Sequence, residues 1–213
     1  YTPALAPGGL VSIFGRRLAV SEAQANRLPL PVDLAGTSVT LNGRKLPLFY
    51  VSSSQINAQL PYDVTGPVKL QVTTINGSVD VPAEIAAVAP AIFVFNGSAG
   101  LVPAITHSNG VLVSAAAPAR PGEILTVYMT GLGKVSGEVL EGQPAPTGVA
   151  TLLANPVEVR VGAATMTPLF AGLAPGYAGL YQVNFRVPPA AGVQPLEIAV
   201  DGVPSNAVTL PVA

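Results

Sequence analysis

The stretch Leu180-Tyr-Gln-Val-Asn-Phe-Arg-Val187 alternates apolar and polar residues, and so does an earlier stretch, Ser54-Gln-Ile-Asn-Ala-Gln-Leu-Pro61. Successive side chains of an extended chain point to opposite faces, so a period of two predicts a half-buried β-strand in each case. In the earlier strand the apolar face takes Ile56, Ala58 and Leu60, and the polar face takes Gln55, Asn57 and Gln59. Because the same strand occurs twice, the rest of the chain can be aligned around it.

The aligned chain shows an internal duplication. Pro7-Gly8 returns as Pro121-Gly122, and Gln55-Ile-Asn57 returns as Gln182-Val-Asn184. The offset between matching positions is larger for the second match than for the first, because loops lengthen while strands keep their length. A repeat of roughly one hundred residues is too long for a solenoid unit and is the size of one β-sandwich.

Turn signals within each repeat predict short strands joined by tight hairpins. Asn42-Gly43 and Asn76-Gly77 each separate two strand-like runs, and Asn-Gly tolerates the positive φ angles of hairpin turns. Pro82 cannot donate to a ladder, so we expect it at a sheet edge or a bulge. The sequence therefore predicts an all-β protein with two tandem immunoglobulin-like (TIG/E-set-like) β-sandwich domains related by internal duplication. We place the first repeat at residues 1–95 and the second at 96–213, the latter preceded by a small connecting hairpin at about 100–113.

Composition narrows the classes of function. Of 213 residues 49% are hydrophobic and 10% charged, against a typical charged fraction of about 25%. The net charge of −1 gives no broad attraction to nucleic acid, and no apolar run is long enough for a membrane span. The absence of cysteine excludes disulfides, thiolate metal sites and a Cys nucleophile. The chain begins at Tyr1 with neither Met nor a signal peptide, so we expect a fragment or processed form that has lost any export signal.

Residues that could carry chemistry are few. His107 is the single histidine and lies in a predicted turn, where His, Ser, Asn and Gly are ordinary residues. Glu138 and Glu141 are the closest pair of acids, and they lie in a Gly-rich loop that is typical of solvated charges. The other acids are scattered, which leaves calcium between the domains as an open alternative. We therefore predict no catalytic residue, no cofactor and no metal site, and a protein that is not an enzyme.

Two groups of residues are candidates for binding or for packing at the domain joint. The first is a set of tyrosines near the two opening strands, and it consists of Tyr50, Tyr62, Tyr177 and Tyr181. They could pack in the core or at the joint, or form an aromatic platform for a glycan. The second is the pair of amides in each repeat, Gln55 with Asn57 and Gln182 with Asn184. We expect these amides to bond neighbouring loop backbone, and the alternative is a face that binds a partner.

The chain resembles the Solibacter-type C-terminal domain found at the ends of large exported proteins of Acidobacteria. The motifs that carry the resemblance are Val11-Ser-Ile-Phe-Gly15, Gln55-Ile-Asn57, Arg120-Pro-Gly-Glu123, Thr130-Gly-Leu-Gly133 and Gly179-Leu-Tyr-Gln-Val-Asn184. They are spread over nearly the whole chain. The resemblance implies an exported bacterial protein with tandem Ig/TIG-like repeats, and it implies no catalytic residues.

These observations favour a non-catalytic extracellular or cell-surface module of an exported bacterial protein. Its role would be adhesion, spacing or self-assembly, including filament formation, because edge strands with few charges can pair with another chain. The expected partners are proteins or further copies of the chain. A carbohydrate-binding accessory module is the alternative, and a hydrolase is a third possibility that the residues support least.

Overall fold

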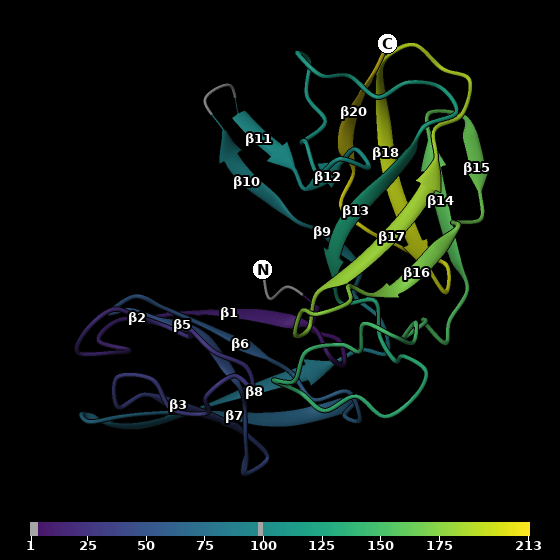
Figure 1. Cartoon of the computed structure of the whole chain (residues 1–213). Helices are drawn as coiled ribbons and strands as arrows, with labels where there is room; N and C mark the ends of the chain where they lie inside the picture. Colours follow the sequence, from purple (N-terminus) through teal and green to yellow (C-terminus); the bar gives the residue numbers. More distant parts are fainter. Residues whose placement is uncertain (1–3, 98–99) are drawn as a thin grey trace.

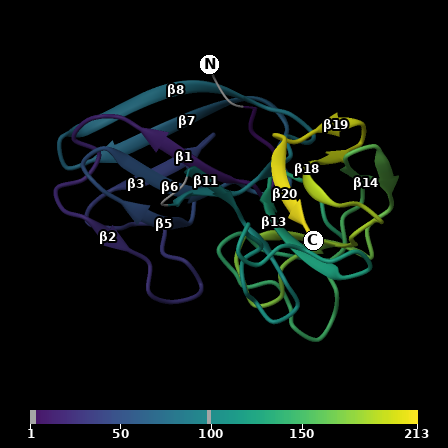
Figure 2. The same ribbon diagram turned by 90° about the horizontal axis from the view of Figure 1, so that it is seen from above.

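The computed structural model describes residues 4–97 and 100–213 and folds them into two β-sandwiches (Figure 1). Twenty strands and no helix occur in these ranges, which confirms the all-β prediction. Figure 2 shows the two sandwiches side by side, with the C-terminus in the second. In the described part of the chain no helix is long and apolar enough to cross a membrane.

Two four-stranded sheets build the first sandwich. One has the order β1-β6-β5-β2, and its strands are β1 (Leu10–Phe14), β6 (Gln55–Gln59), β5 (Leu48–Val51) and β2 (Ala23–Gln24). The other has the order β4-β3-β7-β8, with β4 (Arg44–Lys45), β3 (Ser38–Leu41), β7 (Gly66–Thr74) and β8 (Gly77–Ile85). Val39, Ile56 and Leu70 lie in the core between these sheets. β3 and β7 alternate sides, so their apolar faces enter this core and their polar faces meet solvent.

The second sandwich repeats this plan. One sheet has the order β12-β13-β17-β16, and β9 also pairs with β13; the strands are β9 (Ala91–Ile92), β12 (Ile105–Thr106), β13 (Ile124–Thr130), β16 (Phe170–Leu173) and β17 (Tyr181–Arg186). The other contains β14 (Val157–Val161), β15 (Ala164–Met166), β18 (Gly192–Val200), β19 (Val203–Pro204) and β20 (Val208–Val212). A ribbon of β10 (Val94–Gly97) and β11 (Gly100–Pro103) projects beside it (Figure 1).

Equivalent pairings in the two sandwiches keep the alignment found in the sequence. Leu5 forms a parallel bridge with Ile85, and Ala119 forms one with Val212. Leu5 matches Ala119 in the register that matches Pro7 with Pro121, and Ile85 matches Val212 in the register that matches Gln55 with Gln182. β6 lies between β1 and β5, and β17 lies between β13 and β16. The alternating stretches quoted first are therefore the same interior strand of two duplicated sandwiches.

The segment between the sandwiches contains more pairing than the single predicted hairpin. His107 N donates to Val111 O at 2.9 Å, and Thr106 bridges Leu112, so a hairpin does occur within 100–113. The ribbon of β10 and β11 precedes it. The boundary at residue 95 stays a prediction, and β9, just before it, pairs with β13 of the second sandwich. Pro82 lies in β8, an edge strand, as expected.

Candidate functional site

The joint between the sandwiches is centred on Tyr181, the first residue of β17. Tyr181 is on the same face of its strand as Val183 and is completely buried. Its hydroxyl donates to the carbonyl of Gly133 at 2.7 Å and lies 3.2 Å from the carbonyl of Pro7 in the first repeat. Burial raises the pKa of Tyr181 well above its usual value, with the nearby Tyr62 adding to the shift. A neutral hydroxyl therefore connects the two repeats.

Gly8 allows the chain to pass close to these rings. A Cβ atom on Gly8 would lie 2.2 Å from the ring of Tyr62 and 2.6 Å from the hydroxyl of Tyr181. The φ angle of Gly8 is +69°, a region that residues with side chains rarely adopt. Both reasons make glycine the residue that fits here.

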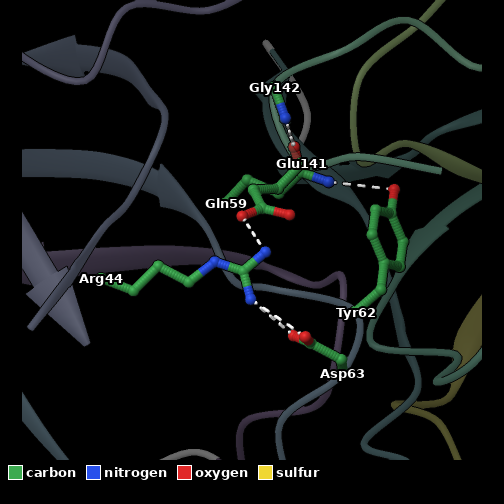
Figure 3. A network of polar contacts seen from close by, with 6 residues as sticks. All are labelled: Arg44, Gln59, Tyr62, Asp63, Glu141 and Gly142. Atoms are coloured by element: carbon green, nitrogen blue, oxygen red, sulfur yellow. Dashed lines mark hydrogen bonds and ion pairs between the residues drawn. The ribbon is translucent and has the colours of Figure 1, made fainter. Parts of the chain in front are cut away.

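Gln59 is the second component of the joint. This side chain is fully buried, its Oε1 accepts a hydrogen bond from Gly142 N at 2.7 Å, and its Nε2 donates to the Tyr62 hydroxyl at 3.0 Å (Figure 3). Leu30 N in turn donates to the Gly142 carbonyl at 2.9 Å. Burial raises the pKa of Tyr62 to about 12, against the opposing effect of the Gln59 hydrogen bond. The long loop 131–156 of the second repeat is thus bonded to the first.

Arg44 closes the rim of the joint. Its guanidinium pairs with Asp63 at 2.8 Å and with Glu141 of the long loop (Figure 3). Glu141 was expected to be a solvated charge, but its side chain is only 14% exposed, because the loop folds back onto the first repeat. Pairs at such rims contribute about 0–1 kcal/mol, so Arg44 adds orientation more than stability.

One backbone contact completes the joint. Leu10 N of β1 donates to Thr130 Oγ1 at the end of β13, at 2.8 Å. No buried side-chain nitrogen or oxygen among the described residues lacks a partner. A satisfied, buried polar network is rigid, because breaking any bond leaves an unpaired group. The joint can hold the two sandwiches in one arrangement.

The amide pairs do not bond loop backbone, and this expectation was wrong. Gln182 Nε2 donates to Asn184 Oδ1 at 3.2 Å, and Asn184 Nδ2 donates to Thr126 Oγ1 at 3.2 Å. The first repeat has the same arrangement: Asn57 Oδ1 accepts from Gln55 Nε2 at 2.7 Å and from Ser12 Oγ at 3.0 Å. Next-but-one residues on a strand share a face, and so do directly paired residues, which explains why the amides meet each other and a cross-strand hydroxyl.

The four tyrosines are divided between two settings. Tyr62 and Tyr181 meet at the joint, where both are within reach of Gly8. Tyr50 is half-buried on β5, and Tyr177 is 60% exposed in a loop. The hydroxyls of Tyr50 and Tyr177 form no hydrogen bond with the described residues. The structure therefore brings two of the predicted tyrosines together and leaves the other two apart from the joint network.

His107 belongs to a separate ion pair. Its Nδ1 lies 2.6 Å from Glu123 Oε1, and its Nε2 lies 3.1 Å from the carbonyl of Ala117. The hydrogen bond with Glu123 raises the pKa of His107, and burial opposes this. In the imidazolium form both ring nitrogens donate, so the histidine ties the hairpin to the segment that enters β13. Within residues 4–97 and 100–213 no group of three His, Cys, Asp or Glu side chains is placed to hold a metal ion.

Sequence reasoning missed Gln59 and Glu141. Alternation assigned Gln59 to the wet face of its strand, but the second repeat covers that end of the strand. One signal was present: in the register that matches Gln55 with Gln182, Gln59 aligns with Arg186 instead of another glutamine. Positions where the repeats differ in this way are candidates for contacts that only one repeat makes.

No protein-family model matches the chain, and the search of curated proteins finds no match. Among solved structures the chain is similar to SGBP-B of the mixed-linkage glucan utilization locus of Bacteroides ovatus, in complex with a mixed-linkage heptasaccharide. That likeness has a TM-score of 0.37 and 11% identity, and covers 99% of this chain and 43% of that one. The chain is also similar to SGBP-B from a complex xyloglucan utilization locus of Bacteroides uniformis. That likeness has a TM-score of 0.32 and 15% identity, and covers 99% of this chain and 46% of that one.

A surface glycan-binding protein of Prevotella bryantii has a TM-score of 0.29 and 11% identity, with coverage of 99% of this chain and 37% of that one. The chain thus spans less than half the length of these three proteins.

Proposed function

We propose that the chain is a non-catalytic extracellular module that holds two β-sandwiches in one fixed arrangement and so spaces and orients what is attached to it. The observation that carries the proposal is the buried polar joint. Tyr181 and Gln59 are fully buried, and their bonds cross from one repeat to the other. Linked domains usually move relative to each other, but a buried polar network whose hydrogen bonds are all satisfied holds its parts in one geometry. A joint built this way supports a rigid unit.

Several of the residues that could do chemistry are already engaged in structure. His107 is bound by Glu123 and by the carbonyl of Ala117. Glu158 and Glu197 both pair with Arg160, at 2.6 and 3.0 Å. This supports the proposal that the protein is not an enzyme. A bacterial cell surface as its location, and the Solibacter-type family as its origin, stay predictions from the sequence.

Distance measurements between spin labels test the fixed arrangement. The chain contains no cysteine, so Asn76→Cys and Ala163→Cys introduce two unique label sites in exposed hairpin turns of the two repeats. We expect one narrow distance distribution between the labels. In the double variant Gln59→Leu, Tyr181→Phe, the distance distribution of the same two labels should be broader. A broad distribution in the otherwise unchanged chain would refute the proposal.

A glycan array separates this role from the carbohydrate-binding alternative. Tyr50 and Tyr177 are the predicted tyrosines outside the joint network, so they are the ones available to a sugar. Specific glycan binding that is lost in Tyr177→Ala or Tyr50→Ala would favour the alternative.

Light scattering over a range of concentrations tests self-assembly, which also stays a prediction.

A further inference from the structure

Equivalent strands of the two repeats, β1 and β13, have different neighbours. β13 pairs with β17 on one side, and with β12 and β9 on the other. β1 pairs with β6 on one side, and no strand among the described residues pairs with its other side (Figure 1). Equivalent strands are therefore paired on both sides in the second repeat and on one side only in the first.

The open side of β1 presents its own hydrogen-bonding groups. Gly15 N donates to Ser54 O at 3.1 Å, so the odd-numbered residues of β1 face β6 and the groups of Ser12 and Phe14 point outward. In the second repeat the residue equivalent to Phe14 is Tyr128. Tyr128 N donates to Ala104 O at 2.9 Å, and Tyr128 O accepts from Phe93 N at 3.1 Å. The groups that are bonded in one repeat are thus left open in the other.

The apolar residues of the two edge strands β1 and β8 are together called the seam. It is formed by Val11 and Ile13 of β1, which are half-buried, and by Val79 and Val81 of β8, which are 54% and 43% exposed. Val81 pairs with the buried Leu70, so its side chain points to the inside of the sandwich.

The second repeat shows what fills such a seam. The equivalents of Val11 and Ile13 there are Leu125 and Val127, and both are completely buried. Ile105 of β12 lies directly opposite Val127, and Val113 follows it in the same core. A covering strand with an apolar side chain at every second residue therefore completes the sandwich.

β1 also lacks the features that protect other edges. Edge strands are commonly blunted by proline or charge. β8 carries Asp80 and Pro82, and β4 is Arg44-Lys45, whereas β1 is Leu10-Val-Ser-Ile-Phe14 with neither. The Phe14 side chain is 73% exposed.

We propose that the open edge of β1 is a docking site for an extended peptide segment from outside these 213 residues. The segment adds antiparallel to β1, as β12 does to β13. It places a branched apolar residue opposite Ile13, where Ile105 would stand, and a hydroxyl residue opposite Ser12, where Thr106 would stand. Its beginning lies beside Arg16 and Arg17, which have no ion pair within the described residues, so an acidic residue fits there. The inference deepens the proposed function and rests on it, since it names the kind of partner a rigid linking module takes.

The probe is an acetylated, fluorescent peptide with the sequence of residues 102–108 preceded by one glutamate. Anisotropy measures its binding, and nitrogen-15 NMR shifts of the full chain locate it. Ser12→Pro removes an outward N–H that β6 does not use, so the ladder between β1 and β6 is kept. We expect binding at least tenfold weaker in Ser12→Pro and unchanged in Ser12→Ala, which keeps the N–H. A peptide with aspartate in place of its isoleucine should also bind at least tenfold more weakly. This second test uses the unchanged protein.

Shifts confined to β1, β8 and residues 15–17, with both losses, would support the proposal. Shifts at β13, no binding, or equal binding by the aspartate peptide would overturn it. Dimers that disappear in Ser12→Pro would overturn it as well, because the occupant would then be a second copy. Ser12 makes no hydrogen bond to the described residues of the second repeat, so the spin-label distance in the peptide-free chain should be the same in Ser12→Pro. Failure of the rigid joint and failure of the docking edge are therefore measured separately.

Discussion

Replacing Tyr181 by phenylalanine removes one hydroxyl from the joint and leaves the ring in place. The hydroxyl is buried, donates a hydrogen bond to Gly133 O at 2.7 Å and lies 3.2 Å from Pro7 O. Phenylalanine has the same shape, so the packing of the ring is unchanged and the loss comes from carbonyls that no longer have this donor. A buried group left unpaired costs about 1–3 kcal/mol. We expect Tyr181→Phe to lower the free energy of unfolding by about 2 kcal/mol.

Urea unfolding followed by far-UV circular dichroism measures this change. Because the hydroxyl contacts both repeats, the variant should also separate the unfolding midpoints of the two sandwiches. Tyr177→Phe is the matched control, since its side chain is mostly exposed and such substitutions change stability by within about 0.5 kcal/mol. If the free energy of unfolding falls by the same small amount in both variants, the joint does not couple the repeats through Tyr181.

Four further variants test other parts of the structure. The hydrogen bond with Glu123 raises the pKa of His107 above 6.5. The stabilisation that the charged histidine gives the fold is therefore complete below pH 6.5 and is lost as the pH rises through the raised pKa. Thermal melts from pH 5 to 9 should show this change in melting temperature in the unchanged chain and not in His107→Gln. Gly131→Ala should cost about 3 kcal/mol or more, since φ is +74° and the new Cβ would lie 2.0 Å from a backbone oxygen, whereas Gly137→Ala, at φ +78° in open space, should cost about 1–2 kcal/mol in urea unfolding. Asn184→Ala should lower stability by about 1 kcal/mol, and an unchanged melting temperature would contradict the role given to its hydrogen bonds.

The strands could be predicted because their signals are local. Alternation placed Ile56, Ala58 and Phe185 in the core, and all three are completely buried. The turn at Asn42-Gly43 has positive φ at both residues, as its sequence predicts. These features depend on neighbours along the chain, which a single sequence contains.

The joint could not be predicted because its partners are far apart in the sequence. Gln59 and Gly142 are separated by 83 residues, and Tyr181 and Pro7 by 174. No periodicity connects such positions. The polar pattern of the Gln59 strand is the same whether its end meets water or another domain, so only the three-dimensional arrangement decides that Gln59 is buried.

The joint residues break the duplication, and this has a physical consequence. In the register that matches the two amide pairs, Tyr181 aligns with Ser54, Gln59 with Arg186 and Tyr62 with Pro189. If both repeats carried all of these residues, the outer end of one chain would offer the surface that the joint uses, and copies could join head to tail without closing. Divergence at the joint confines this contact to one place in the molecule. The duplicated strands supply two similar cores, and the unduplicated residues determine that the cores meet once.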